Sequence, residues 1–262
     1  MAPPPNRIHR LAKYGGVEEY CRFSGFCPAI ARCSGIDEDR GMNVAKGHPD
    51  EIRLIAVRHG ETEANAAGRY SGKLDTPLTQ DGVEQARALG ERFRNVHFDV
   101  IYSSDLSRAR NTARAIARHH DMEPIIDPNL RERGYGEMEG LAYGEARSRF
   151  PEVFSQLDGF VTSYPIPGGE SADQVRERVT TFVERIVREH QGQTVVAAAH
   201  GGILRALFWH LLELPYRVVR RSRCDNTAVS VFRYRKGVWM LEMWNDTGHL
   251  EESSVGASGL IT

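Results

Sequence analysis

The sequence TVVAAAHGG at residues 194–202 predicts a buried strand that ends directly at a histidine and two glycines. The sequence IRLIAVRHG at residues 52–60 has the same layout, since 52–57 is apolar apart from Arg53 and is followed by Arg58, His59 and Gly60. Apolar runs of this kind are typical of strands that are covered on both faces. In open α/β sheets, ligands bind at the carboxyl ends of the strands. If these two strands are neighbours, we expect His59 and His200 to meet at one edge of the sheet.

Outward from these strands, apolar runs alternate with stretches of helical spacing. The spacing predicts a helix over 78–94 with Thr79 as its N-cap, and a long amphipathic helix over 171–191 that begins at Ser171. The other expected elements are a strand at 100–103, helices at 106–119 and 203–214, and hairpin strands at 229–233 and 238–244 around Lys236-Gly237. This alternation predicts an α/β fold, a three-layer α/β/α sandwich with a mostly parallel central sheet.

The regular pattern divides the chain into three parts. Residues 1–50 mix Pro, Gly, Cys and charge without periodicity, and we expect them to be an N-terminal extension. Met42 precedes the patterned region, so the hypothesis is that 1–41 is either disordered or the artefact of an upstream start codon. Residues 51–250 form the expected domain and 251–262 a C-terminal tail.

Metal binding by the N-terminal extension is the alternative to disorder. Its candidate ligands are His9, Cys21, Cys27 and Cys33. The cysteines are six residues apart, whereas structural zinc sites usually contain CxxC-like pairs. We therefore expect no metal site.

The bulk composition excludes several classes of partner. The formal net charge of −1 favours neither nucleic acid nor an anionic membrane surface, and the basic run Arg217–Arg223 is typical of a solvated face. The sequence has no run of about 18 apolar residues and no apolar stretch of signal-peptide type at its start. Three of the four cysteines lie in the first 33 residues, which is a poor layout for a disulfide framework. The expected compartment is the cytoplasm.

The residues at the strand ends suit a phosphoryl group. Arg58 adjoins His59, and Arg108 lies just past the strand predicted at 100–103. Guanidinium forks match phosphate oxygens in a bidentate manner, and the helix that starts at Gly201 adds its positive end. A neutral imidazole can attack phosphorus and form a phosphohistidine. A carboxyl group must also face the site to protonate the leaving oxygen, and spacing alone leaves Glu132, Glu137 and Glu139 as candidates.

Four ordered segments carry a resemblance to a known family: RHGETEAN (58–65), SSDLSRARNTA (103–113), LRERGYGEMEG (130–140) and AAHGG (198–202). In order and approximate spacing they closely resemble the histidine phosphatase superfamily, also called phosphoglycerate-mutase-like, and within it the short cytoplasmic phosphatases. The resemblance covers about residues 52–245. It implies the phosphoglycerate-mutase-like fold.

The resemblance also implies residue roles. His59 would be the phosphorylated nucleophile, with Arg58, Arg108 and His200 around the phosphoryl group. Glu132 would be the general acid, which selects it from the three glutamates. The substrate-binding residues implied are Asn65, Ser71 and Gly72, and the helix start predicted above adds Gly201 to them. No metal and no cofactor are implied, since arginine and histidine supply the positive charge.

Two other functions remain open at this point. A phosphoglycerate mutase of this family carries an insertion with two adjacent arginines and resembles AAHGN. Here the interval 141–179 contains Arg147 and Arg149 but no adjacent arginine pair, and Gly202 replaces the asparagine. Both departures favour hydrolysis over isomerisation. A non-catalytic binding domain would have lost part of the site, and no part is lost.

The resemblance further implies a small phosphorylated metabolite as substrate, such as α-ribazole phosphate, a sugar phosphate or a broad range of phosphomonoesters. The segment 141–170 is expected to cap the pocket. A homodimer is a further possibility that the sequence does not decide.

Overall fold

A computed structural model describes residues 48–250 of the chain. The predictions for the N-terminal extension, including the candidate metal ligands His9, Cys21, Cys27 and Cys33, and for the tail at 251–262 fall on residues outside this range. Within residues 48–250, none of the helices combines the length and the hydropathy that crossing a bilayer requires.

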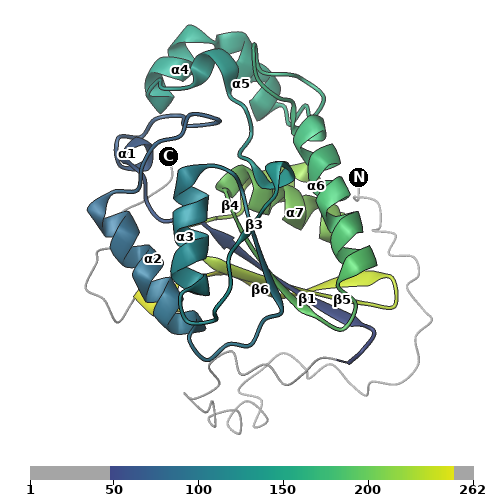
Figure 1. The fold of residues 1–262 in the computed structure, drawn as a ribbon. Helices are drawn as coiled ribbons and strands as arrows, with labels where there is room; N and C mark the ends of the chain where they lie inside the picture. Colours follow the sequence, from purple (N-terminus) through teal and green to yellow (C-terminus); the bar gives the residue numbers. More distant parts are fainter. Residues whose placement is uncertain (1–47, 251–262) are drawn as a thin grey trace, which may run out of the picture. The chain divides into compact units, whose positions relative to one another are not determined.

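A six-stranded sheet lies at the centre of the fold, in the order β3-β2-β4-β1-β5-β6 (Figure 1). The first four strands in this order are mutually parallel, and the last two are antiparallel to their neighbours. The predicted mostly parallel α/β sheet is therefore confirmed. The strands are β1 (Glu51–Arg58), β2 (Val100–Ser103), β3 (Ile125–Ile126), β4 (Thr194–Ala199), β5 (Val229–Arg235) and β6 (Val238–Asp246).

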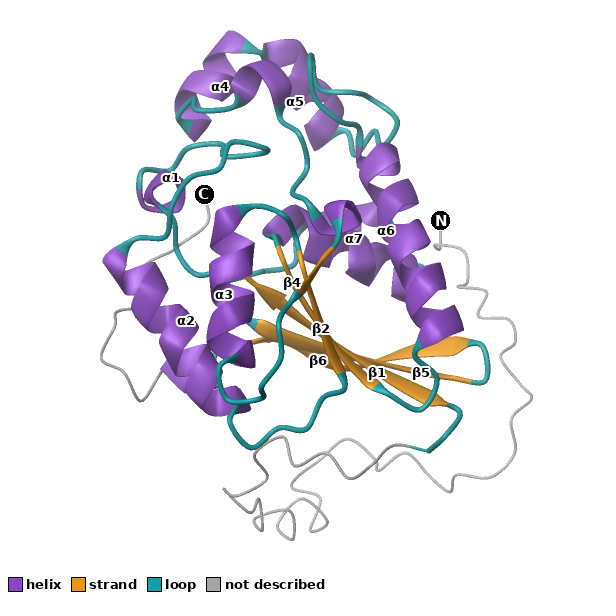
Figure 2. Cartoon of the chain, viewed as in Figure 1, coloured by secondary structure: helices purple, strands orange, loops and turns teal. Residues whose placement is uncertain are grey.

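Helices cover both faces of the sheet, as Figure 2 shows with α2 and α3 on one side and α6 and α7 on the other. Helices α4 and α5 stand apart from the sheet at the top of this view. The helices are α1 (Glu63–Ala66), α2 (Gln80–Phe93), α3 (Ser107–Ala117), α4 (Tyr143–Arg149), α5 (Pro151–Asp158), α6 (Ala172–Glu189), α7 (Gly201–Leu212) and α8 (Tyr216–Arg220).

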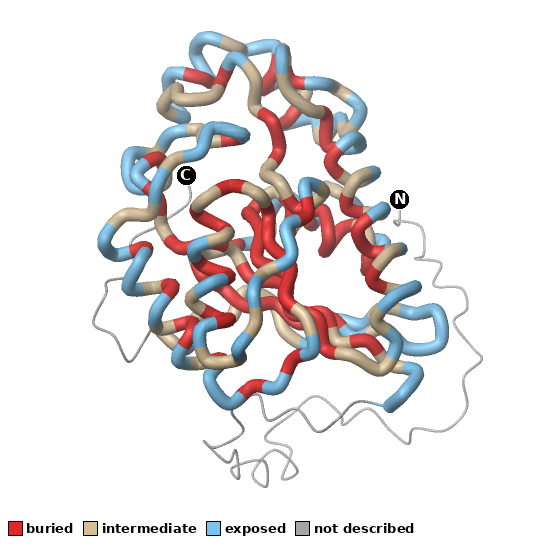
Figure 3. Tube along the Cα trace, in the orientation of Figure 1, coloured by how far each residue is buried: buried red, intermediate tan, exposed pale blue. Residues whose placement is uncertain are grey.

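The apolar residues of β1 are divided between two cores because successive side chains of a strand point to opposite faces. Leu54 and Ala56 belong to the cluster shared with α6 and α7, whereas Ile55 and Val57 belong to the cluster shared with α2 and α3. All four are fully buried, and the buried segments run through the middle of Figure 3. This burial on both faces explains why the strand reads as an almost unbroken apolar run.

The expected capping residues begin two of the helices. Thr79 Oγ1 accepts a hydrogen bond from Gly82 N at 2.9 Å at the start of α2. Ser171 and Gln174 form a reciprocal capping box at the start of α6. Lys236 and Gly237 both have positive φ angles, 50° and 84°, which is the backbone that a two-residue type I′ hairpin requires. The predicted helix starts and the predicted hairpin are confirmed.

The segment between Glu132 and Ser171 forms a separate small cap. It contains α4 and α5, neither of which the sequence pattern predicted as a helix. Its own apolar cluster consists of buried Met138, Ala146, Val153, Phe154, Leu157 and Ile166. The cap therefore packs largely on itself rather than on either core of the sheet.

Candidate active site

The register of β1 against β4 brings the two predicted histidines together. Arg58 pairs with Ala199, the last residues of the two strands, and His59 N donates to Ala199 O at 3.0 Å. The ring centroids of His59 and His200 are consequently 5.0 Å apart. His59 is 4% exposed and His200 is completely buried.

One ring nitrogen of His59 is fixed by its own backbone. His59 Nδ1 lies 2.6 Å from the carbonyl oxygen of Gly60. A carbonyl only accepts, so Nδ1 carries the proton and the lone pair of the neutral ring is on Nε2. Gly60 is required here, because a Cβ at this position would lie 2.3 Å from Gly82 O.

Both histidines are held in the neutral state. Burial, followed by the cations of Arg58 and Arg108, lowers the pKa of His59 well below its ordinary value. Burial is also the main cause that lowers the pKa of His200, with the neighbouring His59 and Arg108 adding to it. A neutral His59 has the free lone pair that nucleophilic attack requires.

Arg108 links His200 to the loop at 72–74. Its Nε donates to His200 Nδ1 at 3.2 Å, so the proton of the neutral His200 ring is on Nε2, which donates to Ser104 Oγ at 2.8 Å. Its Nη1 donates to Leu74 O at 2.7 Å and its Nη2 to Gly72 O at 2.8 Å. The Arg108 side chain thus fixes the tautomer of His200 and the backbone of the loop at 72–74.

The same loop accounts for the role of Glu139, one of the three glutamates that spacing left as candidates for the general acid. Glu139 Oε1 accepts from Lys73 N at 3.0 Å and from Tyr135 N at 2.9 Å. Gly72 has a φ angle of +52°, and a Cβ on it would lie 2.1 Å from Glu139 Oε1. Glu139 therefore supports the loop rather than facing the cavity, and Glu137 is exposed outside it.

Glu132 reaches the cavity over the first turn of α7. Its Oε2 accepts from Gly202 N at 3.2 Å and its Oε1 from Arg133 N at 2.8 Å. A Cβ on Gly202 would lie 2.3 Å from Glu132 Oε1. The absence of a side chain at position 202 is therefore what permits this position of the carboxyl group.

Asn65 is fixed by two neighbours through its amide oxygen. Asn65 Oδ1 accepts from Thr62 N at 3.3 Å, as part of the capping box of α1, and from Asn226 Nδ2 at 3.2 Å. The side-chain oxygen of Asn65 thus accepts two hydrogen bonds from protein groups, and its amide nitrogen is the group that can donate to a ligand in the cavity. Asn226 also donates to His59 O at 3.0 Å, which ties the two segments together.

These segments enclose a cavity of about 220 Å³. Eight of the nine predicted site residues line it, and His200 lies behind His59 and Arg108 instead. Sequence reasoning missed six lining residues, of which Arg205 had a usable signal, since it follows Gly201 by four positions and so shares its helix face. The lining residues are Arg58, His59, Asn65, Arg69, Tyr70, Ser71, Gly72, Arg108, Glu132, Tyr135, Tyr143, Gly201, Gly202 and Arg205.

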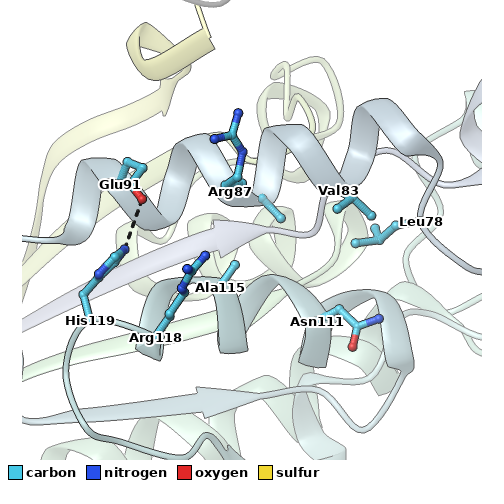
Figure 4. A pocket seen from close by; sticks show the side chains of 9 residues that line it. Leu78, Val83, Arg87, Glu91, Asn111, Ala115, Arg118 and His119 are labelled. Atoms are coloured by element: carbon cyan, nitrogen blue, oxygen red, sulfur yellow. Dashed lines mark ion pairs between the residues drawn. The ribbon is translucent and has the colours of Figure 1, made fainter.

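A larger cavity of about 390 Å³ lies between α2 and α3 (Figure 4). Its walls include Leu78, Val83 and Ala115, and Glu91 pairs with His119 at 3.3 Å on one side. None of the predicted site residues lines it. In the part of the chain that the structure describes, no three His, Cys, Asp or Glu side chains converge as metal ligands would.

Comparisons with known proteins identify the family. Residues 54–247 match the family described as histidine phosphatase superfamily (branch 1). The chain belongs to this superfamily, and the predicted family and phosphatase class are confirmed.

Particular relatives carry both phosphatase and mutase-like names. The chain is 38% identical to phosphoglycerate mutase-like protein 4 of Arabidopsis thaliana, over 80% of this chain and 92% of that protein. It is 37% identical to the metal-independent phosphoserine phosphatase of the same plant, over 80% and 87% respectively. Among solved structures, a mycobacterial glucosyl-3-phosphoglycerate phosphatase complexed with VO3 matches with a TM-score of 0.67 at 31% identity, covering 74% of this chain and 98% of that one.

The contact between Gly202 and Glu132 generates a first prediction. Gly202→Ala should displace the Glu132 carboxyl group and lower kcat by ~10-fold or more, with a smaller change in KM, since a misplaced acid–base group affects the chemical step. Adding Glu132→Asp, which shortens the side chain, should restore part of the loss. Gly144→Ala is the matched control, because a Cβ there meets nothing within 4 Å. Steady-state kinetics with an alkyl phosphate would test this, and unchanged kcat in Gly202→Ala would contradict it.

The environment of His59 generates a second prediction. Its imidazole should remain unprotonated as the pH falls through 6.5, because burial and two arginines oppose the charged ring. Since a lowered pKa means that protonation requires more acid, the nucleophilic form persists in mildly acidic solution. Replacing one cation, as in Arg58→Gln, should raise the pKa. An NMR titration of protein with isotopically labelled histidine would measure the pKa of His59 in the unmodified protein and in Arg58→Gln, with His59→Gln used to identify its signals. A midpoint at or above 6.5 in the unmodified protein would contradict the lowered pKa.

Proposed function

We propose that this protein hydrolyses small phosphomonoesters through a phosphohistidine formed on His59 Nε2. The observation that carries the proposal is the neutral, buried His59 with its proton fixed on Nδ1, in a cavity that Arg58 and Arg108 also line. Guanidinium groups stabilise the charge that spreads over the equatorial oxygens of a transferring phosphoryl group. Because the His59 imidazole stays neutral beside these cations, its lone pair is free to attack phosphorus.

In the first step, His59 Nε2 forms a bond to phosphorus while the bond from phosphorus to the ester oxygen breaks. Glu132, the acidic side chain that lines the cavity, gives its proton to the leaving oxygen, and the product alcohol departs. The N-terminus of α7 lies at the same place and favours negative charge. In the second step, water attacks the phosphohistidine, Glu132 takes a proton from it, and phosphate leaves with His59 neutral again.

His200 supports these steps from behind His59 and Arg108. His200 has no exposed surface and is bonded on both ring nitrogens, so we assign it the role of holding Arg108 and packing against the His59 ring. Asn65, Ser71, Gly72 and Gly201 line the cavity as the remaining substrate-binding residues.

Hydrolysis is favoured over isomerisation by the positions of the cap arginines. Arg147 pairs with Asp158 at 3.0 Å and lies over the Phe154 ring, and Arg149 lies over Phe150. Neither lines the cavity, so the cap provides no arginine pair of the kind that holds the substrate carboxylate in a mutase. The named phosphatases among the relatives support the same choice, and their substrates are small phosphorylated metabolites.

The test is a metal-free assay of residues 42–262 with 3-phosphoglycerate and catalytic 2,3-bisphosphoglycerate in EDTA, in which free phosphate and 2-phosphoglycerate are followed together. A panel of other phosphomonoesters is assayed in parallel. Phosphate release without isomer formation is expected. Rapid 2-phosphoglycerate formation without matching phosphate release would make the protein a mutase instead.

Glu132→Gln provides a third prediction. It should slow hydrolysis of alkyl phosphates by ~10²–10⁴, the usual contribution of a positioned acid–base group. With p-nitrophenyl phosphate, whose leaving group needs little protonation, the first step should persist and the second should slow, so that an initial burst of nitrophenol appears. Stopped-flow absorbance measures the burst. An unchanged steady-state rate for both substrates would move the acid to another group.

A further inference from the structure

The cavity contains more positive charge than one phosphoryl group neutralises. Four arginines line it, Arg58, Arg69, Arg108 and Arg205, against the one carboxylate of Glu132. None of the four has a carboxylate within ion-pair distance in the part of the chain that the structure describes. A bound phosphomonoester carries about −1.5 to −2 charges at neutral pH. Uncompensated positive charge therefore remains once the phosphoryl group is in place.

Arg205 is held toward the cavity by a segment that holds Arg58 as well. Arg205 Nε donates to Ser222 O at 3.1 Å, and Arg58 Nη1 donates to Cys224 O at 2.5 Å. These two carbonyls are two residues apart in one segment. The guanidinium groups consequently have fixed positions, and each keeps further N–H groups for a ligand.

The two guanidinium groups approach each other over the start of α7. A Cβ on Gly201 would lie 3.4 Å from Arg205 Nη1 and 3.7 Å from Arg58 Nε. Arg58 Nε is buried and has no hydrogen-bond partner among the residues that the structure describes. Arg108 lines the same cavity, with its Nε bonded to His200. Arg58 and Arg108 suit the phosphoryl group beside His59, which leaves Arg69 and Arg205 as additional cations. Arg69 Nη1 donates to Gly140 O, whereas Arg205 is the one that lies beside Arg58 at the start of α7.

We propose that Arg205 binds a second anionic group of the substrate, the carboxylate of a phosphorylated amino acid or hydroxy acid. This inference rests on the proposed phosphatase function and names its substrate class. The fork of a guanidinium group matches a carboxylate in a bidentate manner. Tyr70, Tyr135 and Tyr143 line the same cavity and add hydroxyl groups for the polar part of such a substrate.

The experiment compares substrates that differ only in the carboxylate. O-phosphoserine is paired with O-phosphoethanolamine, and 3-phosphoglycerate with glycerol 3-phosphate, with p-nitrophenyl phosphate as a general measure of activity. The unmodified protein should prefer the carboxylate member of at least one pair by ~10-fold or more in kcat/KM, the effect expected of one charge-assisted hydrogen-bonded contact. Arg205→Met should remove this preference and leave the rates for the other members within ~3-fold.

Arg217→Met is the matched control, since Arg217 is an exposed arginine on α8 outside the cavity, and it should leave the preference intact. Equal losses for both members of a pair in Arg205→Met would overturn the proposal, because Arg205 would then bind the phosphoryl group. Equal rates for both members in the unmodified protein would also overturn it. No hydrolysis of any of the five substrates by the unmodified protein would instead contradict the phosphatase function itself.

Discussion

The buried guanidinium group of Arg108 connects three parts of the proposed active site: the His200 ring, the loop at 72–74 and the cavity beside His59. It is 1% exposed, and placing a charged group in such surroundings is costly unless its hydrogen bonds are formed. Arg108 forms them with His200 and with two carbonyls of the loop at 72–74. Through these bonds one side chain sets the protonated nitrogen of His200, the path of the loop at 72–74 and the positive charge beside His59. A substitution at Arg108 would disturb all three at once.

A second constraint is that two glycines lie so close to neighbouring atoms that a side chain at either position would clash. Gly202 admits the Glu132 carboxyl group, and Gly60, whose carbonyl holds the His59 ring, admits the backbone of Gly82 in α2. At each position even a methyl group would enter an occupied volume. The proposed nucleophile and the proposed acid thus depend on glycines that carry no chemistry themselves. Together with Arg108, they make the geometry of the site a property of packing as well as of charge.

Much of the fold could be predicted because its signals are local. The two apolar strands that end at His59 and His200, the caps at Thr79 and Ser171 and the Lys236-Gly237 turn each lie within a short stretch of sequence. The cap could not be predicted in the same way, since α4 and α5 are short and their apolar residues pack on one another. Strand β3 has only two residues, and its Ile125 and Ile126 are exposed, so it gives no burial pattern.

The site shows the same division between local and long-range information. His59, His200 and Gly201 follow strands directly, so the topology alone predicts their meeting point. The choice of Glu132 over Glu139 depends on which carboxylate supports the loop at 72–74, which is a contact across more than 60 residues. Tyr70, Tyr135 and Tyr143 enter the cavity through the packing of the cap, which no periodic pattern encodes. Arg205 is intermediate, because helical spacing places it on the face of Gly201.

The most direct test of the account is to locate the phosphoryl group on the enzyme. Glu132→Gln protein would be mixed with p-nitrophenyl phosphate and quenched in denaturing alkali, where phosphohistidine survives. Peptide mass spectrometry would identify the residue, and phosphorus NMR the ring nitrogen. Phosphate is expected on Nε2 of His59, because Nδ1 donates its proton to Gly60 O. Phosphate on His200, on Nδ1 of His59 or on no histidine during turnover would contradict it.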